Sequence, residues 1–329
     1  MPAPFSAALL SLDYQSEADR IAACLRDYLL SVRRKGVVIG LSGGIDSSVT
    51  LALCVRAIGA ERVFGLHMPE RDSADDTLDL SQLVARHFGV ASEVEEITAL
   101  LDAAGCYRRR DAAIRTVIPE YATDWKCKIV LSGGVEKGGL NVFHVVAQSP
   151  DGTQIKKRLP LDAYLGVVAA SNFKQRIRKM LEYYHADRLN YATTGTPNRL
   201  EYDQGFFVKQ GDGAADIKPI AHLYKTQVYA LAEYLGVPED IRRRPPTTDT
   251  YSLPQGQDEF YFALPYAQMD LCLLGKNRGY APAEVAPSVG ITAEQVERVY
   301  KDIDAKRSAT RYLHLGPRLV EAVTETGAK

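Results

Sequence analysis

The sequence carries almost no net charge, and this lack argues against one broad class of function. Among its 329 residues are 40 Lys and Arg against 41 Asp and Glu, which gives a formal net charge of −1. Non-specific nucleic-acid binding depends on an excess of positive charge, so we expect no nucleic-acid partner. Three short basic runs are more typical of a solvated surface than of a phosphate site. They are Arg108-Arg109-Arg110, Lys156-Lys157-Arg158 and Arg242-Arg243-Arg244.

Cysteine is scarce as well. The chain has five cysteines, dispersed and without a Cys-x-x-Cys pair: Cys24, Cys54, Cys106, Cys127 and Cys272. Structural zinc sites and disulfide frameworks need closely spaced or evenly paired cysteines. We therefore expect a reduced, cytoplasmic protein with neither feature.

Long apolar runs are missing too. No apolar run approaches the length that crosses a membrane, and residues 1–12 lack the basic flank and apolar stretch of a secretory signal. No membrane partner is expected. Apolar residues still make up 46% of the chain and charged residues 25%, which is typical of a globular protein with an ample core.

Strand-like and helix-like segments alternate along the first half of the chain. Short β-branched runs predict buried strands, and apolar residues at helical spacing predict helices. The expected strands span 36–41, 63–68, 92–97 and 189–194, and the expected helices span 16–32, 47–57 and 75–88. This alternation predicts an α/β fold with a doubly wound, Rossmann-like parallel sheet.

The alternation breaks between residues 102 and 165. Two β-like runs there, 141–148 and 154–159, flank Pro150-Asp151-Gly152, a turn signal between apolar runs. We interpret 102–165 as a β-rich insertion within a single domain that spans 1–329.

The part of the chain from 245 to 329 begins with a loop-like composition and continues with helical patterns. The clearest helix is expected at 292–307, where Thr292 and Gln295 match a capping box. We therefore expect a helical C-terminal part.

A glycine-rich segment joins the first expected strand to the following helix. Its residues are Gly40, Leu41, Ser42, Gly43, Gly44, Ile45, Asp46 and Ser47. Unpaired N–H groups and the dipole at a helix start attract an anion, and glycine lets the backbone approach phosphate oxygens. The segment therefore predicts a phosphate-binding loop.

The loop lacks the lysine of the G-x-x-x-x-G-K-[ST] motif and instead carries Asp46 at the helix start. A carboxylate beside phosphates repels them unless a hard cation lies between, so Asp46 is a candidate Mg²⁺ ligand. The alternative is a simple strand-to-helix turn in which Asp46 and Ser47 cap the helix.

This segment resembles the signature loop of the ATP-pyrophosphatase, or PP-loop, superfamily. The resemblance implies an adenine nucleotide alpha hydrolase-like fold, binding of ATP through its pyrophosphate at residues 40–47, and transfer of AMP to a substrate oxygen. The loop does not choose among the members of the superfamily.

The stretch from Asn172 to Asp270 resembles the ammonia-dependent type of NAD synthetase. Three segments correspond to the family patterns N-x-K-x-R-x-R, G-T-x-x-x-x-E and G-F-F-T-K-x-G-D-G-x-A-D-x-x-P. They are Asn172-Phe-Lys174-Gln-Arg176-Ile-Arg178, Gly195-Thr196-Pro-Asn-Arg-Leu-Glu201 and Gly205-Phe-Phe-Val-Lys209-Gln-Gly-Asp212-Gly-Ala-Ala-Asp216-Ile-Lys-Pro219. The last match is the most specific because it is long and ordered.

The resemblance implies roles for the matching residues. The implied ATP contacts, besides the loop, are Thr196, Lys225 and Thr247, and the implied Mg²⁺ ligands are Asp46 and Glu201. The implied contacts to deamido-NAD are Arg176, Lys209, Asp216 and Lys306. Asp46, Lys209 and Lys225 would be the catalytic residues.

The implied reaction is the ATP-dependent amidation of deamido-NAD to NAD. The carboxylate attacks the α-phosphorus of ATP, pyrophosphate leaves, and ammonia then displaces AMP from the acyl-adenylate. We see no glutaminase domain in the sequence, so we expect ammonia to be used directly or supplied by a separate glutaminase. The resemblance also implies a homodimer.

Three departures from the family pattern keep other functions open. Ala305 replaces the histidine expected before Lys306, residues 248–251 differ from the family loop, and the 102–165 region is longer than the family linker. One alternative is a paralogous PP-loop ligase that forms an amide on a different carboxylic acid. Another is a non-catalytic nucleotide-binding module, which would keep the loop without needing Glu201, Lys209 and Lys225.

Overall fold

The computed structural model describes residues 4–132, 142–245, 250–256, 261–262, 264–321 and 323. Its main sheet has four parallel strands in the order β3-β2-β1-β7. They are β1 (Val37–Gly40), β2 (Val63–His67), β3 (Ala91–Val94) and β7 (Ala192–Thr193). The chain builds outward from β1 and then returns to its other side at β7, so the predicted doubly wound α/β fold is confirmed.

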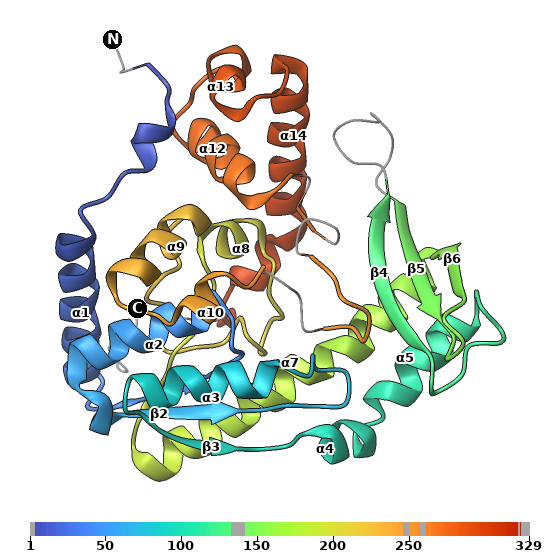
Figure 1. Cartoon of the computed structure of the whole chain (residues 1–329), viewed down its shortest axis with the longest axis horizontal. Coiled ribbons are helices and arrows are strands. Elements are labelled where there is room, and N and C mark those ends of the chain that lie inside the picture. The colour runs from blue at the N-terminus through green and yellow to red at the C-terminus, as the bar shows by residue number, and fades with distance from the viewer. Residues whose placement is uncertain are drawn as a thin grey trace.

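Helices cover both faces of this sheet (Figure 1). Residues of β1 alternate between two apolar clusters: Val37 and Ile39 pack in one, and Val38 packs in the other. The first cluster joins the sheet to α1 (Tyr14–Ser31), α2 (Ile45–Ile58), α3 (Thr77–His87), α9 (Lys225–Tyr234) and α10 (Glu239–Arg242). The second joins it to α4 (Thr98–Ala103), α5 (Cys106–Arg115) and the long helix α7 (Leu161–Leu189). Burial on both faces explains why β1 is an apolar, β-branched run.

A second sheet is antiparallel and lies to one side of the parallel sheet, next to one end of α7 (Figure 1). Its strands are β4 (Lys126–Ser132), β5 (Val142–Gln148) and β6 (Gln154–Arg158). The predicted β5–β6 hairpin is confirmed, but β4 was not expected from the sequence. The 102–165 region also contains α5 and the start of α7, so it is only partly β-structure.

The C-terminal part is helical, as expected. It contains α12 (Tyr266–Asn277), α13 (Pro282–Val289) and α14 (Ala293–Thr310), with α8 (Arg199–Gln204) packed against α14. The Oγ1 of Thr292 accepts a hydrogen bond from the N–H of Gln295, and the Oε1 of Gln295 accepts one from the N–H of Thr292. The predicted capping box is therefore confirmed. The described residues also contain three short 3₁₀ turns: η1 (Ala7–Leu10), η2 (Ala60–Arg62) and η3 (Arg311–His314).

Among the residues that the structure describes, no helix is both long enough and apolar enough to cross a membrane. Each of the five cysteines has a free thiol.

Candidate active site

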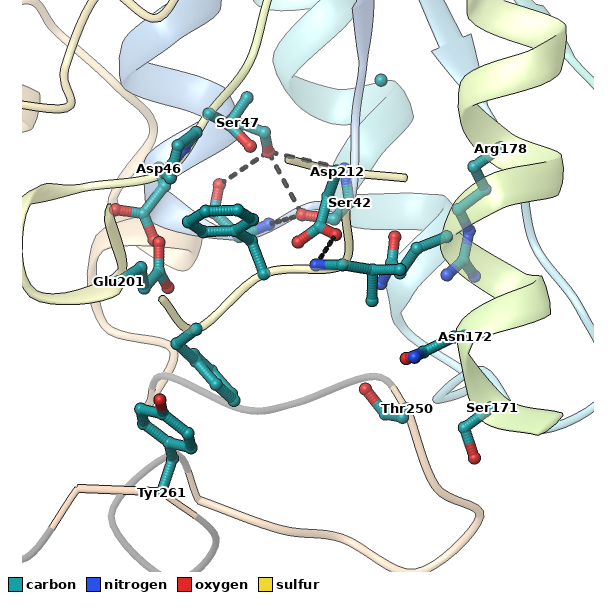
Figure 2. A pocket seen from close by; sticks show the side chains of 18 of the residues that line it. Ser42, Asp46, Ser47, Ser171, Asn172, Arg178, Glu201, Asp212, Thr250 and Tyr261 are labelled. Atoms are coloured by element: carbon teal, nitrogen blue, oxygen red, sulfur yellow. Dashed lines mark hydrogen bonds between the residues drawn. The ribbon is translucent and has the colours of Figure 1, made fainter. Parts of the chain in front are cut away.

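A cavity of about 550 Å³ lies at the carboxyl ends of β1 and β2. This is the edge where parallel α/β sheets bind their ligands, and the volume suits a nucleotide-sized molecule. The loop 40–47, α3, α7, the segment 205–212 and the start of α9 all contribute to its walls. Figure 2 shows Asp46 and Glu201 on one side of this pocket and Asn172 and Ser171 of α7 on the other.

The loop takes the shape that its serines and glycines allow. Gly44 precedes α2 in an extended conformation, and its N–H donates to the Oγ of Ser42 (3.3 Å). The Oγ of Ser47 donates to the carbonyl of Gly44 (3.1 Å) and lies 3.3 Å from the Oγ of Ser42. All residues from 40 to 47 except Gly43 line the cavity. Helix α2 therefore points its N-terminus at the cavity, as an anion-binding loop requires.

Gly43 has a different role from its neighbours. Its φ is +68°, and a Cβ there would lie 2.9 Å from both the Cβ of Leu80 and the carbonyl oxygen of Thr77. Glycine at this position therefore allows the turn and the close packing of the loop on α3.

Asp46 does not cap α2, which disfavours the simple turn as an explanation of the loop. Its carboxylate forms an ion pair with the ammonium of Lys225 and accepts a hydrogen bond from the Nδ2 of Asn198 (3.2 Å). Glu201 of α8 lines the same cavity, and its Oε2 accepts from the N–H of Asn198 (3.1 Å). Asn198 therefore ties the two candidate Mg²⁺ ligands together.

Lys225 is 1% exposed and begins helix α9. Burial alone would lower its pKa, but the carboxylates of Asp46 and Glu201 outweigh burial and raise the pKa above its usual value. The carboxylate of Asp270 accepts hydrogen bonds from the N–H groups of Lys225 (3.2 Å) and Thr226 (2.7 Å). Asp270 thus fixes the helix start that places the ammonium of Lys225 beside Asp46.

The two carboxylates suit a hard cation that takes its remaining ligands from phosphate and water. Among the residues that the structure describes, no cluster of three or more His, Cys, Asp or Glu side chains could hold a metal ion alone. Asp46 and Glu201 are therefore two candidate oxygen donors on the wall of one cavity.

Arg176 and Lys209 also line the cavity. The Nε of Arg176 donates to the carbonyl of Lys209 (3.3 Å). The ammonium of Lys209 donates to the carbonyls of Tyr312 (2.7 Å) and Leu315 (2.8 Å), which follow α14. The segment after α14 therefore holds the lysine at the rim of the cavity.

Two sequence-predicted residues lie outside the lining of this cavity. The Oδ2 of Asp216 accepts from the N–H (2.7 Å) and Oγ1 (3.1 Å) of Thr193 at the end of β7. The ammonium of Lys306 donates to Asp302 and to the carbonyl of Tyr261, both at 2.6 Å. Burial lowers the pKa of Lys306 despite the neighbouring Asp302. Thr196 does line the cavity, whereas Thr247 falls outside the described residues.

A buried ion-pair network beside α7 was not expected from the sequence. Arg110 and Lys174 are each 1% exposed. Arg110 contacts Asp72 (2.5 Å) and Asp111 (2.9 Å). Lys174 contacts Glu70 (2.7 Å) and Asp72 (2.8 Å), and it donates to the carbonyl of Thr250 (2.9 Å). The interpretation of Arg108-Arg109-Arg110 as a solvated run is therefore wrong for Arg110, which neutralises carboxylates inside the fold.

The third basic run also departs from a purely solvated surface. Arg244 lines the cavity, and its guanidinium lies 2.8 Å from Asp76. In contrast, Lys156, Lys157 and Arg158 on β6 are all exposed to solvent, as expected for that run.

This network predicts an acid-sensitive contribution to stability. Burial would raise the pKa of Asp72, but Lys174 and Arg110 lower it from 3.8 to about 2. A lowered carboxylate pKa stabilises the fold above pH 3.8, and this stabilisation is lost as the pH falls toward 2. The expected loss is about 2 kcal/mol. Unfolding of the wild type and of Asp72→Asn, compared from pH 5 to pH 2, measures it. A pH-independent difference between the two proteins would contradict the assignment.

Other cavity residues were also missed by sequence reasoning. His67 is the last residue of β2; it is buried, and its Nδ1 lies 2.8 Å from the Oγ of Ser81. Phe143 and Tyr164 line the part of the cavity near the antiparallel sheet. The rule that ligands bind at carboxyl ends of parallel strands could have singled out His67. No local pattern marks the other two.

Comparisons with known proteins show the family to which the chain belongs. A family model described as NAD synthase matches residues 17–116 and 151–310, which leaves 117–150, with β4 and β5, outside it. An NH(3)-dependent NAD(+) synthetase of Rhizobium meliloti is 62% identical over 321 residues, covering 98% of this chain and 96% of that protein. An NH(3)-dependent NAD(+) synthetase of Thermotoga maritima is 33% identical over 293 residues, covering 89% of this chain and 96% of that protein.

Solved structures share the fold. An NMN synthetase from Francisella tularensis superposes with a TM-score of 0.64 at 22% identity, covering 94% of this chain and 100% of that one. An NH3-dependent NAD synthetase from Campylobacter jejuni superposes with a TM-score of 0.61 at 22% identity, again covering 94% of this chain and 100% of that one. At this identity, the likeness concerns the fold alone.

Proposed function

Because the chain belongs to the NAD synthase family, we propose that it is an ammonia-dependent NAD synthetase that amidates deamido-NAD at the expense of ATP. The observation that carries this proposal is the meeting of loop 40–47, Asp46, Glu201 and Lys225 in one cavity. These residues come from distant parts of the chain. Together they offer N–H groups and a positive charge for a polyphosphate and carboxylates for its cation. Proteins of the family use ATP, and the loop is where its pyrophosphate would bind.

In the proposed ATP site, several groups at fixed positions would share the negative charge of the phosphates. Asp46 and Glu201 would hold Mg²⁺, which supplies positive charge against the phosphate oxygens when bound. The N–H groups at the start of α2 would receive the phosphates directly. Lys225 stays charged because its pKa is raised, so it can stabilise the negative charge of departing pyrophosphate. Thr196 and Thr247 are proposed as further ATP contacts.

On the acid side, Arg176 and Lys209 are proposed to contact deamido-NAD. For Lys209 to reach the substrate, it must exchange the carbonyls of Tyr312 and Leu315 for a phosphate or carboxylate. Asp216 would act by holding the end of β7, just before Gly195 and Thr196. Lys306 is proposed to contact substrate across the interface of the proposed homodimer.

Ammonia is proposed to be the direct nitrogen donor. Neutral ammonia is a nucleophile without activation, so the second step needs positioning more than a catalytic base. Burial raises the pKa of Cys54 and Cys272 to about 12 and that of Cys106 to about 11, so these thiols are poor candidates for a glutaminase nucleophile. The alternative source of ammonia is a separate glutaminase. The free cysteines also suit the predicted cytoplasmic location.

The test is an assay of purified protein with ATP, Mg²⁺, ammonium chloride and deamido-NAD, in which NAD and AMP are measured together. We expect equal amounts of the two products, and little NAD when glutamine replaces ammonium. No NAD from a protein that binds ATP would contradict the proposal.

The same assay separates the alternatives. The acid form of NMN in place of deamido-NAD tests a ligase for a different carboxylic acid, which is a needed comparison because an NMN synthetase shares the fold. ATP binding without AMP release for either acid would indicate a non-catalytic module. The buried charge of Lys225 between two carboxylates argues against that module, because simple nucleotide binding does not need it.

A further inference from the structure

We propose that Phe143 and Tyr164 form an aromatic wall that stacks on a planar ring of the dinucleotide substrate, and that Phe143 is a specificity-determining residue. This inference rests on the proposed function. The two rings are stacked, with centroids 4.1 Å apart and planes at 15°, and both line the cavity. Phe143 belongs to β5, within the stretch 117–150 that the family model does not match.

The position of the wall follows from helix α7. A Cβ added at Gly40 would lie 2.9 Å from the Oε1 of Glu182, so this part of α7 lies beside the phosphate loop. Tyr164 lies 18 residues earlier on the same helix (182 − 164), which corresponds to roughly 27 Å at 1.5 Å per residue. The aromatic wall therefore lies far along α7 from the phosphate loop.

The proposed chemistry assigns this part of the cavity to the acid and not to ATP. Adenylation requires the substrate carboxylate at the α-phosphorus, near loop 40–47. The rest of the dinucleotide, with its pyrophosphate and second base, must extend away from this point. Arg176 lies between Tyr164 and Glu182 along α7, lines the cavity and suits a phosphate of the substrate. Aromatic side chains beyond it suit a heteroaromatic base.

The antiparallel sheet holds Phe143 in place. Alternate residues of a strand share a face, so Phe143, Val145 and Ala147 point the same way. Val145 and Ala147 are fully buried in the cluster that also contains Val167 of α7, whereas Phe143 at the end of this face is half-buried. The packed part of the strand thus fixes a ring whose outer part reaches the cavity.

The experiment compares steady-state kinetics of the full-length wild type with those of Phe143→Ala, Phe143→Leu and Phe143→Tyr. We expect Phe143→Ala to raise KM for deamido-NAD about tenfold with kcat and the KM for ATP unchanged. Phe143→Leu keeps the apolar bulk and should show much of the same effect if its melting temperature matches the wild type. Phe143→Tyr keeps a stacking ring and should keep the KM for deamido-NAD near that of the wild type.

The matched control is His144→Ala, which removes the ring of the next residue, on the opposite face of β5. It should leave the KM for deamido-NAD unchanged.

Calorimetric binding of two acids identifies the ring. We expect Phe143→Ala to lose affinity for deamido-NAD but not for the acid form of NMN, because the wall would hold the adenine that only the dinucleotide carries. An equal loss of affinity for both acids would overturn the assignment of the wall to the second base. Unchanged KM in folded Phe143→Ala and Phe143→Leu, or a parallel rise in the KM for ATP, would overturn the inference. A wild type that makes no NAD would instead contradict the proposed function, so the two failures are distinguishable.

Discussion

Replacing Asp46 by alanine is expected to lower kcat for NAD formation by at least about a hundredfold while the protein remains folded. Asp46 lies at the start of α2, is tied to Glu201 through Asn198, and pairs with Lys225. Its loss would remove one of two proposed Mg²⁺ ligands and leave the charge of Lys225 poorly balanced. Measurement of kcat over a range of Mg²⁺ concentrations tests the role.

Two variants control for effects on the fold. Asp79→Ala removes an exposed carboxylate from the first turn of α3, outside the cavity, and should leave kcat unchanged. Glu201→Gln should require more Mg²⁺ for half-maximal activity, as a weakened metal ligand would. Normal turnover of Asp46→Ala at every Mg²⁺ concentration would rule out the proposed role.

Replacing Lys174 by methionine is expected to lower the free energy of unfolding by about 3–5 kcal/mol. The ammonium of Lys174 contacts Glu70 and Asp72 and donates to the carbonyl of Thr250. Methionine fills a similar volume but leaves two buried carboxylates with less neutralising charge and the carbonyl without its donor. Denaturant unfolding at pH 7 measures the loss.

Lys157→Met is the matched control because Lys157 lies exposed on β6. It should change the free energy of unfolding by no more than about 0.5 kcal/mol. A loss below about 1 kcal/mol for Lys174→Met would mean that water or a rearranged Arg110 replaces the missing charge.

The parallel sheet was predictable because its strands carry their own signal. β1 lies within an apolar, β-branched run, and a glycine-rich loop follows it directly. The hairpin of β5 and β6 was predictable from the turn at Pro150-Asp151-Gly152. β4 was missed because it begins Lys-Cys-Lys, and its buried Cys127 and Ile129 become an apolar face only against β5 and α7.

In the candidate site too, some residues were predictable from local sequence and others were not. Residues 40–47 were recognised from local sequence, and all except Gly43 line the cavity. Arg110 was misread because a run of three arginines looks solvated until the carboxylates of Asp72 and Asp111 are placed around it. Asp216 and Lys306 match family positions, yet their side chains hold Thr193 and Asp302 in this chain.

The sequence by itself determined the α/β class, the phosphate-type loop and the presence of an acid at its helix start. These features depend on residues within one turn or one strand, where glycine conformation, helix polarity and apolar spacing act locally. Tertiary structure alone decided which charges are neutralised and which side chains share the cavity. Lys174 contacts Glu70 although 104 positions separate them in the sequence, and Lys225 contacts Asp46 although 179 positions separate them. Pairs so distant depend on how the sheet and helices pack, because burial and charge neutralisation act through space and not along the chain.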